Sequence, residues 1–157
     1  MDITFGKYKG KLVETIVLKE PDYVLWLLNQ NDASVPLAAV LNETKRLINI
    51  FDKKDFQQKC FGCDQNATYC TAYTDNVTSP YWWCNKCNPY QSGAIAGKLQ
   101  SVRSYQDAIR YVHFNCNANK AALKLLIKIM SEAKGLPERA RDNNVKEFFG
   151  IPVVSKF

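Results

Sequence analysis

The 157-residue sequence contains a single histidine, His113. Histidine is the side chain most often used for proton transfer near neutral pH, so the chain has few side chains suited to general acid–base catalysis. The carboxylates are scattered and lack the paired spacing that a metal-dependent nuclease needs at an open metal site. Gly6 and Gly10 fit neither the spacing nor the helix context of a phosphate-binding loop. We therefore expect no enzymatic activity and assign no catalytic residue.

Long apolar runs are also missing. A membrane-spanning helix needs roughly 20 consecutive apolar residues, whereas the longest apolar stretch, residues 121–130, is interrupted by Lys124 and Lys128. The first residues lack the basic start and apolar stretch of a secretory signal. We expect an intracellular protein of a reducing compartment, the cytoplasm or the nucleus, with no membrane partner.

The positive charge of the chain is unevenly distributed. The net charge of +6 divides into +1 over residues 1–59, −1 over residues 60–95 and +6 over residues 96–157. Such asymmetry favours a polyanionic partner, which means DNA or RNA. The alternative is a solvated basic helical face without a ligand.

Three segments with different patterns indicate an α+β fold in one compact unit. Residues 1–59 predict a small module of β-hairpin and helix, residues 60–95 a zinc-ribbon-like hairpin insert, and residues 96–157 a basic helical part. Pro21 suits the first position of a helix, and Ser104 and Asn119 are suitable N-cap residues.

These patterns predict the following elements. They are a short strand with a glycine turn over 4–11, a strand over 12–18 for which a helix is the alternative, a helix from Pro21, a helix over 35–52, strands over 67–74 and 81–83, helices over 105–115, 120–133 and 145–149, and an extended tail over 151–154.

The four cysteines Cys60, Cys63, Cys84 and Cys87 form two Cys-x-x-Cys pairs. Two intervening residues allow one tight turn to aim both sulfurs at a single ion, and Gly62 eases the first turn. Four thiolates fill the tetrahedral shell of zinc and leave no position for an activated water. We therefore predict one structural zinc ion. A thiol redox pair and disulfides are the alternatives.

Two cysteines and the histidine remain outside this set. We expect Cys70 and Cys116 to be buried apolar side chains, with intermolecular oxidation of Cys116 as the alternative. His113 is expected to pack or form hydrogen bonds rather than replace a cysteine ligand.

The N-terminal sequence resembles a known small module. Phe5-Gly6-Lys7-Tyr8-Lys9-Gly10-Lys11 followed by Pro21-Asp22-Tyr23-Val24-Leu25-Trp26-Leu27-Leu28 is similar to the C-terminal module of exodeoxyribonuclease X-like proteins and related small bacterial and phage proteins. The resemblance covers under a fifth of the chain. It implies association with nucleic-acid enzymes and carries no catalytic residue onto this sequence.

The same segment predicts an aromatic cluster. Phe5, Tyr8, Tyr23 and Trp26 are expected to form a miniature core, with Trp26 buried against Phe5 and Tyr8.

Six lysines are candidate phosphate contacts. The first three alternate and would share one face of a strand, and the last three recur every four residues and would form a stripe on a helix. They are Lys7, Lys9, Lys11, Lys120, Lys124 and Lys128. The alternatives are a lysine edge that discourages strand pairing and the wet side of an amphipathic helix, whose apolar face would be Leu123, Leu126, Ile127 and Met130.

Aromatic residues of the middle segment are candidate stacking faces for bases, and Trp82 is the one assigned to the site. The others are Tyr73, Tyr81, Trp83 and Tyr90. The alternative is that these rings cover the zinc hairpin and pack in its core.

Together these features predict a zinc-stabilised, nucleic-acid-binding accessory protein. The alternative is a regulatory adaptor, of viral or phage origin, that binds a host or replication protein through the zinc hairpin. Binding that falls steeply with salt would favour the first hypothesis, and salt-insensitive capture of one protein the second.

Overall fold

The computed structural model of the chain describes residues 1–31, 34–73, 76–88 and 99–152. Within these residues the elements are α1 (Val13–Lys19), α2 (Pro21–Leu28), α3 (Val35–Lys53), β1 (Tyr69–Tyr73), β2 (Asn76–Trp83), β3 (Leu99–Val102), α4 (Tyr105–Asn115), α5 (Lys120–Ala133) and α6 (Asp142–Phe148). The expected α+β fold is confirmed.

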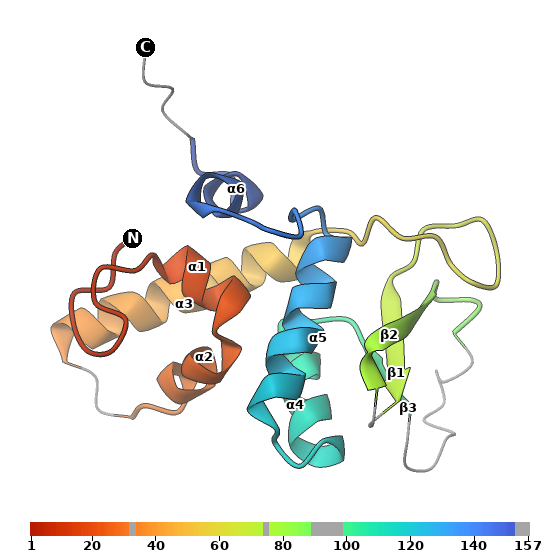
Figure 1. The fold of residues 1–157 in the computed structure, drawn as a ribbon, viewed down its shortest axis with the longest axis horizontal. Helices are drawn as coiled ribbons and strands as arrows, with labels where there is room; N and C mark the ends of the chain where they lie inside the picture. The colour runs from red at the N-terminus through yellow and green to blue at the C-terminus, as the bar shows by residue number, and fades with distance from the viewer. Residues whose placement is uncertain (32–33, 74–75, 89–98, 153–157) are drawn as a thin grey trace.

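Helix α5 stands between the N-terminal helices and the sheet (Figure 1). It contacts α1, α2, α4 and β2. Its buried face carries Leu123, Leu126, Ile127 and Met130, as the helical spacing predicts. Asn119 accepts a hydrogen bond from the Ala122 amide (3.0 Å) and begins the helix as predicted.

The sheet is antiparallel with the strand order β2-β1-β3. Cys70 on the central strand lies opposite Trp82 on one side and Val102 on the other. All three side chains are buried, so this row of the sheet faces the core. The sequence patterns predicted β1 and part of β2 but not β3.

A contiguous apolar core draws on all three segments of the chain. Phe51 of α3 packs edge-on against Tyr105 of α4, with ring centroids 5.4 Å apart, and also contacts Phe148 of α6. The buried Tyr105 hydroxyl donates to the Val17 carbonyl of α1 (2.8 Å). The side chains that close the core therefore come from positions far apart in the sequence.

Helix α4 begins with a capping box. The Ser104 hydroxyl accepts from the Asp107 amide (3.0 Å), and the Asp107 carboxylate accepts from the Ser104 amide (3.1 Å). Burial raises the pKa of Asp107, but hydrogen bonds from Ser104, Arg103 and Arg110 outweigh it and lower the pKa overall. The sequence predicted this helix start.

Two N-terminal expectations need correction. Residues 12–18 were expected to be a strand, with a helix as the alternative, and they form helix α1 from Val13. Val13, Ile16 and Val17 lie on one helical face and are buried, so packing overrides the β propensity of branched side chains. Residues 5–11 form turns rather than a strand.

The ends of this turn region are nevertheless paired. Asp2 and Leu12 form an isolated antiparallel bridge, and the Ile3 amide donates to the Lys11 carbonyl (2.9 Å). Gly6 and Gly10 have φ values of +70° and +86°, which the turns require and which L side chains rarely adopt. Tyr90, the end of the expected strand at residue 74 and the predicted tail beyond residue 152 lie outside the described residues.

Candidate metal centre

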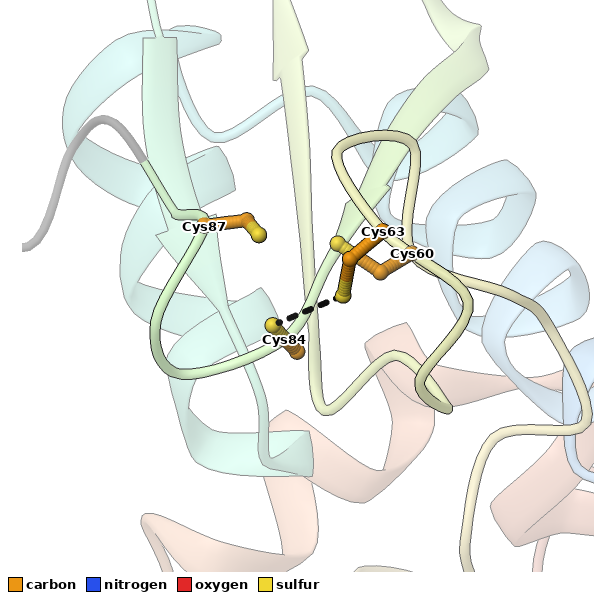
Figure 2. Close-up of side chains that lie close together, drawn as sticks. All are labelled: Cys60, Cys63, Cys84 and Cys87. Carbon is orange, nitrogen blue, oxygen red and sulfur yellow. Dashed lines mark hydrogen bonds between the residues drawn. The ribbon is translucent and has the colours of Figure 1, made fainter.

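The two Cys-x-x-Cys turns meet at one point (Figure 2). Cys60 and Cys63 belong to the loop between α3 and β1, and Cys84 and Cys87 follow β2 directly. The four sulfur atoms all lie within 4.8 Å of one another, and the sulfurs of Cys63 and Cys84 are 3.7 Å apart. The convergence that the sequence spacing predicted is present in the fold.

Backbone hydrogen bonds hold the two turns together. The Phe61 amide donates to the Trp82 carbonyl (2.8 Å), which ties the first turn to the end of β2. Within each turn the chain folds back on itself, because the Cys60 amide donates to Gln65 (2.8 Å) and the Asn88 amide to Cys84 (3.1 Å). The cysteines are thus positioned by main-chain contacts.

Gly62 allows the close approach of the two turns. A β-carbon at this position would lie 2.9 Å from the Cys87 β-carbon and 3.0 Å from its sulfur, closer than real side chains pack. The structure gives a physical reason for glycine at position 62, where the sequence analysis expected it to ease the first turn. It makes room for a ligand of the second turn.

Amide groups point at the sulfurs. The Gly62 amide donates to the Cys60 sulfur (3.3 Å) and the Gln65 amide to the Cys63 sulfur (3.5 Å). Burial works to raise the pKa of Cys60, but hydrogen bonds from the Cys84 and Gly62 amides outweigh it and lower the pKa to about 6. The pKa of Cys84 is also lowered, chiefly by the Cys87 amide. Cys60 and Cys84 thus favour the thiolate, the form that binds metal. The pKa of Cys63 is raised, and side-chain hydrogen bonds with Cys84 and Cys63 raise the pKa of Cys87 to about 12.

The cluster fits a tetrahedral ion. A Zn–S distance of about 2.3 Å implies roughly 3.8 Å between sulfurs at the corners of a regular tetrahedron, and the Cys63–Cys84 separation is 3.7 Å. All six cysteines lie in the described residues, and none of them forms a disulfide. The four-thiol arrangement is therefore a potential metal site rather than a pair of cross-links.

The remaining cysteines and the histidine lie outside the cluster. Cys70 is fully buried on β1, and burial raises its pKa to about 12, which suits the expected packing role. Cys116 is half-buried at the end of α4. His113 is exposed on α4, where its ring contacts Phe114 edge-on at 4.7 Å between centroids.

The six candidate lysines are all exposed, but in two different settings. Lys7, Lys9 and Lys11 lie in the N-terminal turns, so the shared strand face expected for them does not exist. Lys120, Lys124 and Lys128 lie along the exposed side of α5, opposite its buried face, as the spacing predicted. Whether any of them contacts nucleic acid stays a prediction.

Trp82 takes the core position that was the alternative to a stacking role, and Trp26, expected to be buried, is exposed. Trp82 is only 7% exposed and packs edge-on against Phe56 at 5.0 Å between ring centroids, so it has no face for a base. Strand alternation turns its side chain toward the core. Trp26 is 46% exposed because it lies opposite the buried stripe of α2, which is formed by Pro21, Val24 and Leu27.

A groove that the sequence analysis missed lies beside α5. It has a volume of about 570 Å³ and runs between the end of α1, α5 and the connection to α6. Its basic side chains are Lys19, Lys124, Lys128, Arg139 and Arg141. The charge excess after residue 95 pointed to this part of the chain, but only the fold brings Lys19 beside it.

Residues 3–32 match the family described as Exodeoxyribonuclease X-like C-terminal. The match confirms the resemblance seen in the N-terminal motif, and it covers less than a fifth of the chain. No curated protein and no solved structure matches the chain. Among the helices of the described residues, none is long and apolar enough to cross a membrane.

Proposed function

We propose that this protein is a zinc-stabilised, nucleic-acid-binding accessory protein without a catalytic site of its own. The observation that carries the proposal is the convergence of four thiols on one point in a chain whose N-terminal segment matches a family named after a DNA exonuclease. Zinc is the expected ion because four thiolates in a closed tetrahedron are typical of structural zinc sites.

Zinc would act on the fold rather than on a substrate. Cys60, Cys63, Cys84 and Cys87 would supply all four ligands, so no coordination position would remain for water or substrate. The ion would join the loop after α3 to the end of β2 and so hold the sheet against α5. Nucleic acid would then bind to the basic surface of the helices.

The experiment is a binding titration with single-stranded and double-stranded DNA and RNA at about 50 mM and about 200 mM salt. Metal analysis of protein purified without chelator accompanies it. We expect one zinc per chain and an affinity that falls steeply with salt. Protein without zinc, or protein that binds none of the four nucleic acids at the lower salt concentration, would contradict the proposal.

One observation favours a protein-binding adaptor as the second candidate. Phe61 and Tyr81 are 58% and 42% exposed beside the cysteine cluster, and their rings meet edge-on at 5.6 Å between centroids. Exposed aromatic pairs of this kind are frequent at protein interfaces. Salt-insensitive capture of one protein, lost in the variant Phe61→Ser, would favour this function.

A further inference from the structure

Three aromatic rings form a continuous series on the N-terminal part of the molecule. Tyr8 meets Tyr23 edge-on at 4.7 Å between centroids, and Tyr23 stacks on Trp26 at 5.3 Å with 25° between the ring planes. Tyr8 and Tyr23 are half-buried and pack against the core. Trp26, at the end of the series, is therefore held in a defined orientation by Tyr23 while nearly half of its surface stays exposed.

Trp26 is not one of the side chains that form the hydrophobic core or pack against it. Removing its ring from water would be favourable, yet α2 directs it away from the core. Every nucleobase has a flat face that can stack on an aromatic ring, and such stacking tolerates any base. The ring of Trp26 offers a fixed platform of this kind.

Charged side chains of both signs flank the aromatic series. The Lys7 ammonium lies 5.3 Å from the centroid of the Tyr8 ring. On the other side, Glu20 accepts from the Tyr8 hydroxyl (3.3 Å) and pairs with Lys124 of α5 (3.6 Å). Glu20 thus connects the aromatic rings to the lysine stripe.

The lysine stripe continues into the groove beside α5. Lys124 and Lys128 line the groove together with three further basic residues, while its acidic residues are Glu20, Glu132 and Glu138. Basic side chains outnumber acidic ones, so the groove complements a phosphate backbone. The aromatic series reaches this groove through Glu20, which lines it and accepts from the Tyr8 hydroxyl. Aromatic rings combined with a basic groove are typical of proteins that bind single strands.

We propose that single-stranded nucleic acid binds across this surface, with a base stacked on the exposed ring of Trp26 and its backbone along Lys124 and Lys128. The inference rests on the proposed nucleic-acid function and adds the site and the strand type. A duplex is a poor occupant because its bases are already stacked inside the helix and cannot reach a ring. The exposed Phe61 and Tyr81 lie in a segment with a net charge of −1 and are poorer candidates.

The test measures binding of the full-length protein to a labelled single strand of about 16 nucleotides and to the matching duplex. The variant Trp26→Ala is compared with Phe114→Ala, because Phe114 is 76% exposed on α4 and provides a matched exposed ring outside the proposed site. We expect Trp26→Ala to weaken single-strand binding by roughly 10-fold with an unchanged salt slope, since stacking carries no charge. Phe114→Ala should bind like the natural sequence.

A charge variant separates the second part of the surface. Lys124→Gln with Lys128→Gln should lower the log–log salt slope by roughly 0.7 for each lost phosphate contact. Lys45→Gln with Lys53→Gln removes two exposed charges from α3 and serves as the control. Melting curves of every variant confirm folding, and Trp26→Phe, which retains an aromatic face, should keep most of the affinity.

The outcomes distinguish this inference from the proposed function. Protein that binds single strands with the same affinity after Trp26→Ala overturns the inference and leaves the proposed function intact, as does equal or tighter binding to the duplex. Protein that binds no nucleic acid in any form overturns both. Loss of binding in Trp26→Ala but not in Trp26→Phe or Phe114→Ala supports the site.

Discussion

Tryptophan side chains at two positions differ in burial, and their contributions to stability should differ accordingly. Trp82→Ala removes a ring that is 7% exposed and packed on Phe56, so we expect a loss of about 3–5 kcal/mol in the free energy of unfolding. Trp26→Ala removes a ring that stacks only at the surface and should cost about 1 kcal/mol. Urea denaturation of both variants measures the difference. Equal losses would contradict the burial described for these two residues.

Lys134 follows α5 directly, and its buried ammonium group lies at the end of α3. Its ammonium group donates to the carbonyls of Phe51 (2.8 Å) and Lys54 (2.6 Å) and lies 4.7 Å from the centroids of the Phe51 and Phe56 rings. Burial lowers its pKa to about 8 from the ordinary value of 10.5, although Asp52 and Asp55 act in the opposite direction. The folded protein therefore releases this proton at a lower pH than the unfolded chain.

This pKa predicts a pH dependence of stability. Between pH 8 and 10.5 the unfolded state binds more protons at this position than the folded state, so the contribution of Lys134 to the free energy of unfolding rises with pH. The variant Lys134→Met has no amine at this position, so this increase in the free energy of unfolding with pH should be absent from it. The stability of the natural protein relative to Lys134→Met should thus increase from about pH 7 to about pH 10, as urea denaturation at both values would measure. A constant or falling difference would show that burial does not control this amine.

Helix α5 combines a buried apolar face with a lysine stripe, so its two sides can be tested separately. Changing Lys120, Lys124 and Lys128 together to Gln should leave folding almost unchanged, because all three are exposed. If the stripe follows a phosphate backbone, the log–log salt slope should fall by roughly 0.7 to 0.9 for each lost contact. Anisotropy titrations over a series of salt concentrations measure the slope. A folded triple variant with unchanged affinity and slope would exclude the stripe from the binding surface.

Elements with local signals were predictable from sequence, whereas elements that depend on distant partners were not. The four cysteines are positioned by two tight turns, and α4 and α5 begin at recognisable caps. Helix α1 was expected to be a strand because its branched residues favour β structure, and only its packing against α3, α5 and α6 decides otherwise. The pairing of β3 with β1 and the outward position of Trp26 likewise follow from the assembled fold.

The cysteine cluster joins the end of β2 to the loop that follows α3, so loss of a metal bound there should affect more than the cysteine turns. Phe56 and Gln57 connect the cysteine loop to the core, since Phe56 packs on Trp82 and the Gln57 amide donates to the Ala133 carbonyl (2.6 Å). Structural zinc binding can contribute roughly 10 kcal/mol or more of apparent folding free energy. Cys84→Ser should therefore lose the zinc and unfold at least the middle segment.

The matched control is Cys116→Ser, which changes a cysteine outside the cluster. It should retain one zinc per chain. Metal analysis and melting curves recorded with and without chelator measure both effects. A Cys84→Ser protein that melts like the natural protein would show that the ion, if bound, does not support the fold.

The segment that matches the exodeoxyribonuclease family depends on the rest of the chain. Val13 and Val17 of α1 are fully buried by helices that follow in the sequence, and the Val17 carbonyl receives the hydroxyl of Tyr105 from α4. If residues 3–32 were fused to another protein, the side chains of Val13 and Val17 would therefore be exposed to water. The Val17 carbonyl would also lack the hydroxyl of Tyr105 as its hydrogen-bond donor. The segment that the family model recognises is therefore shorter than the unit that could fold in another protein. That unit must also include the helices that bury α1.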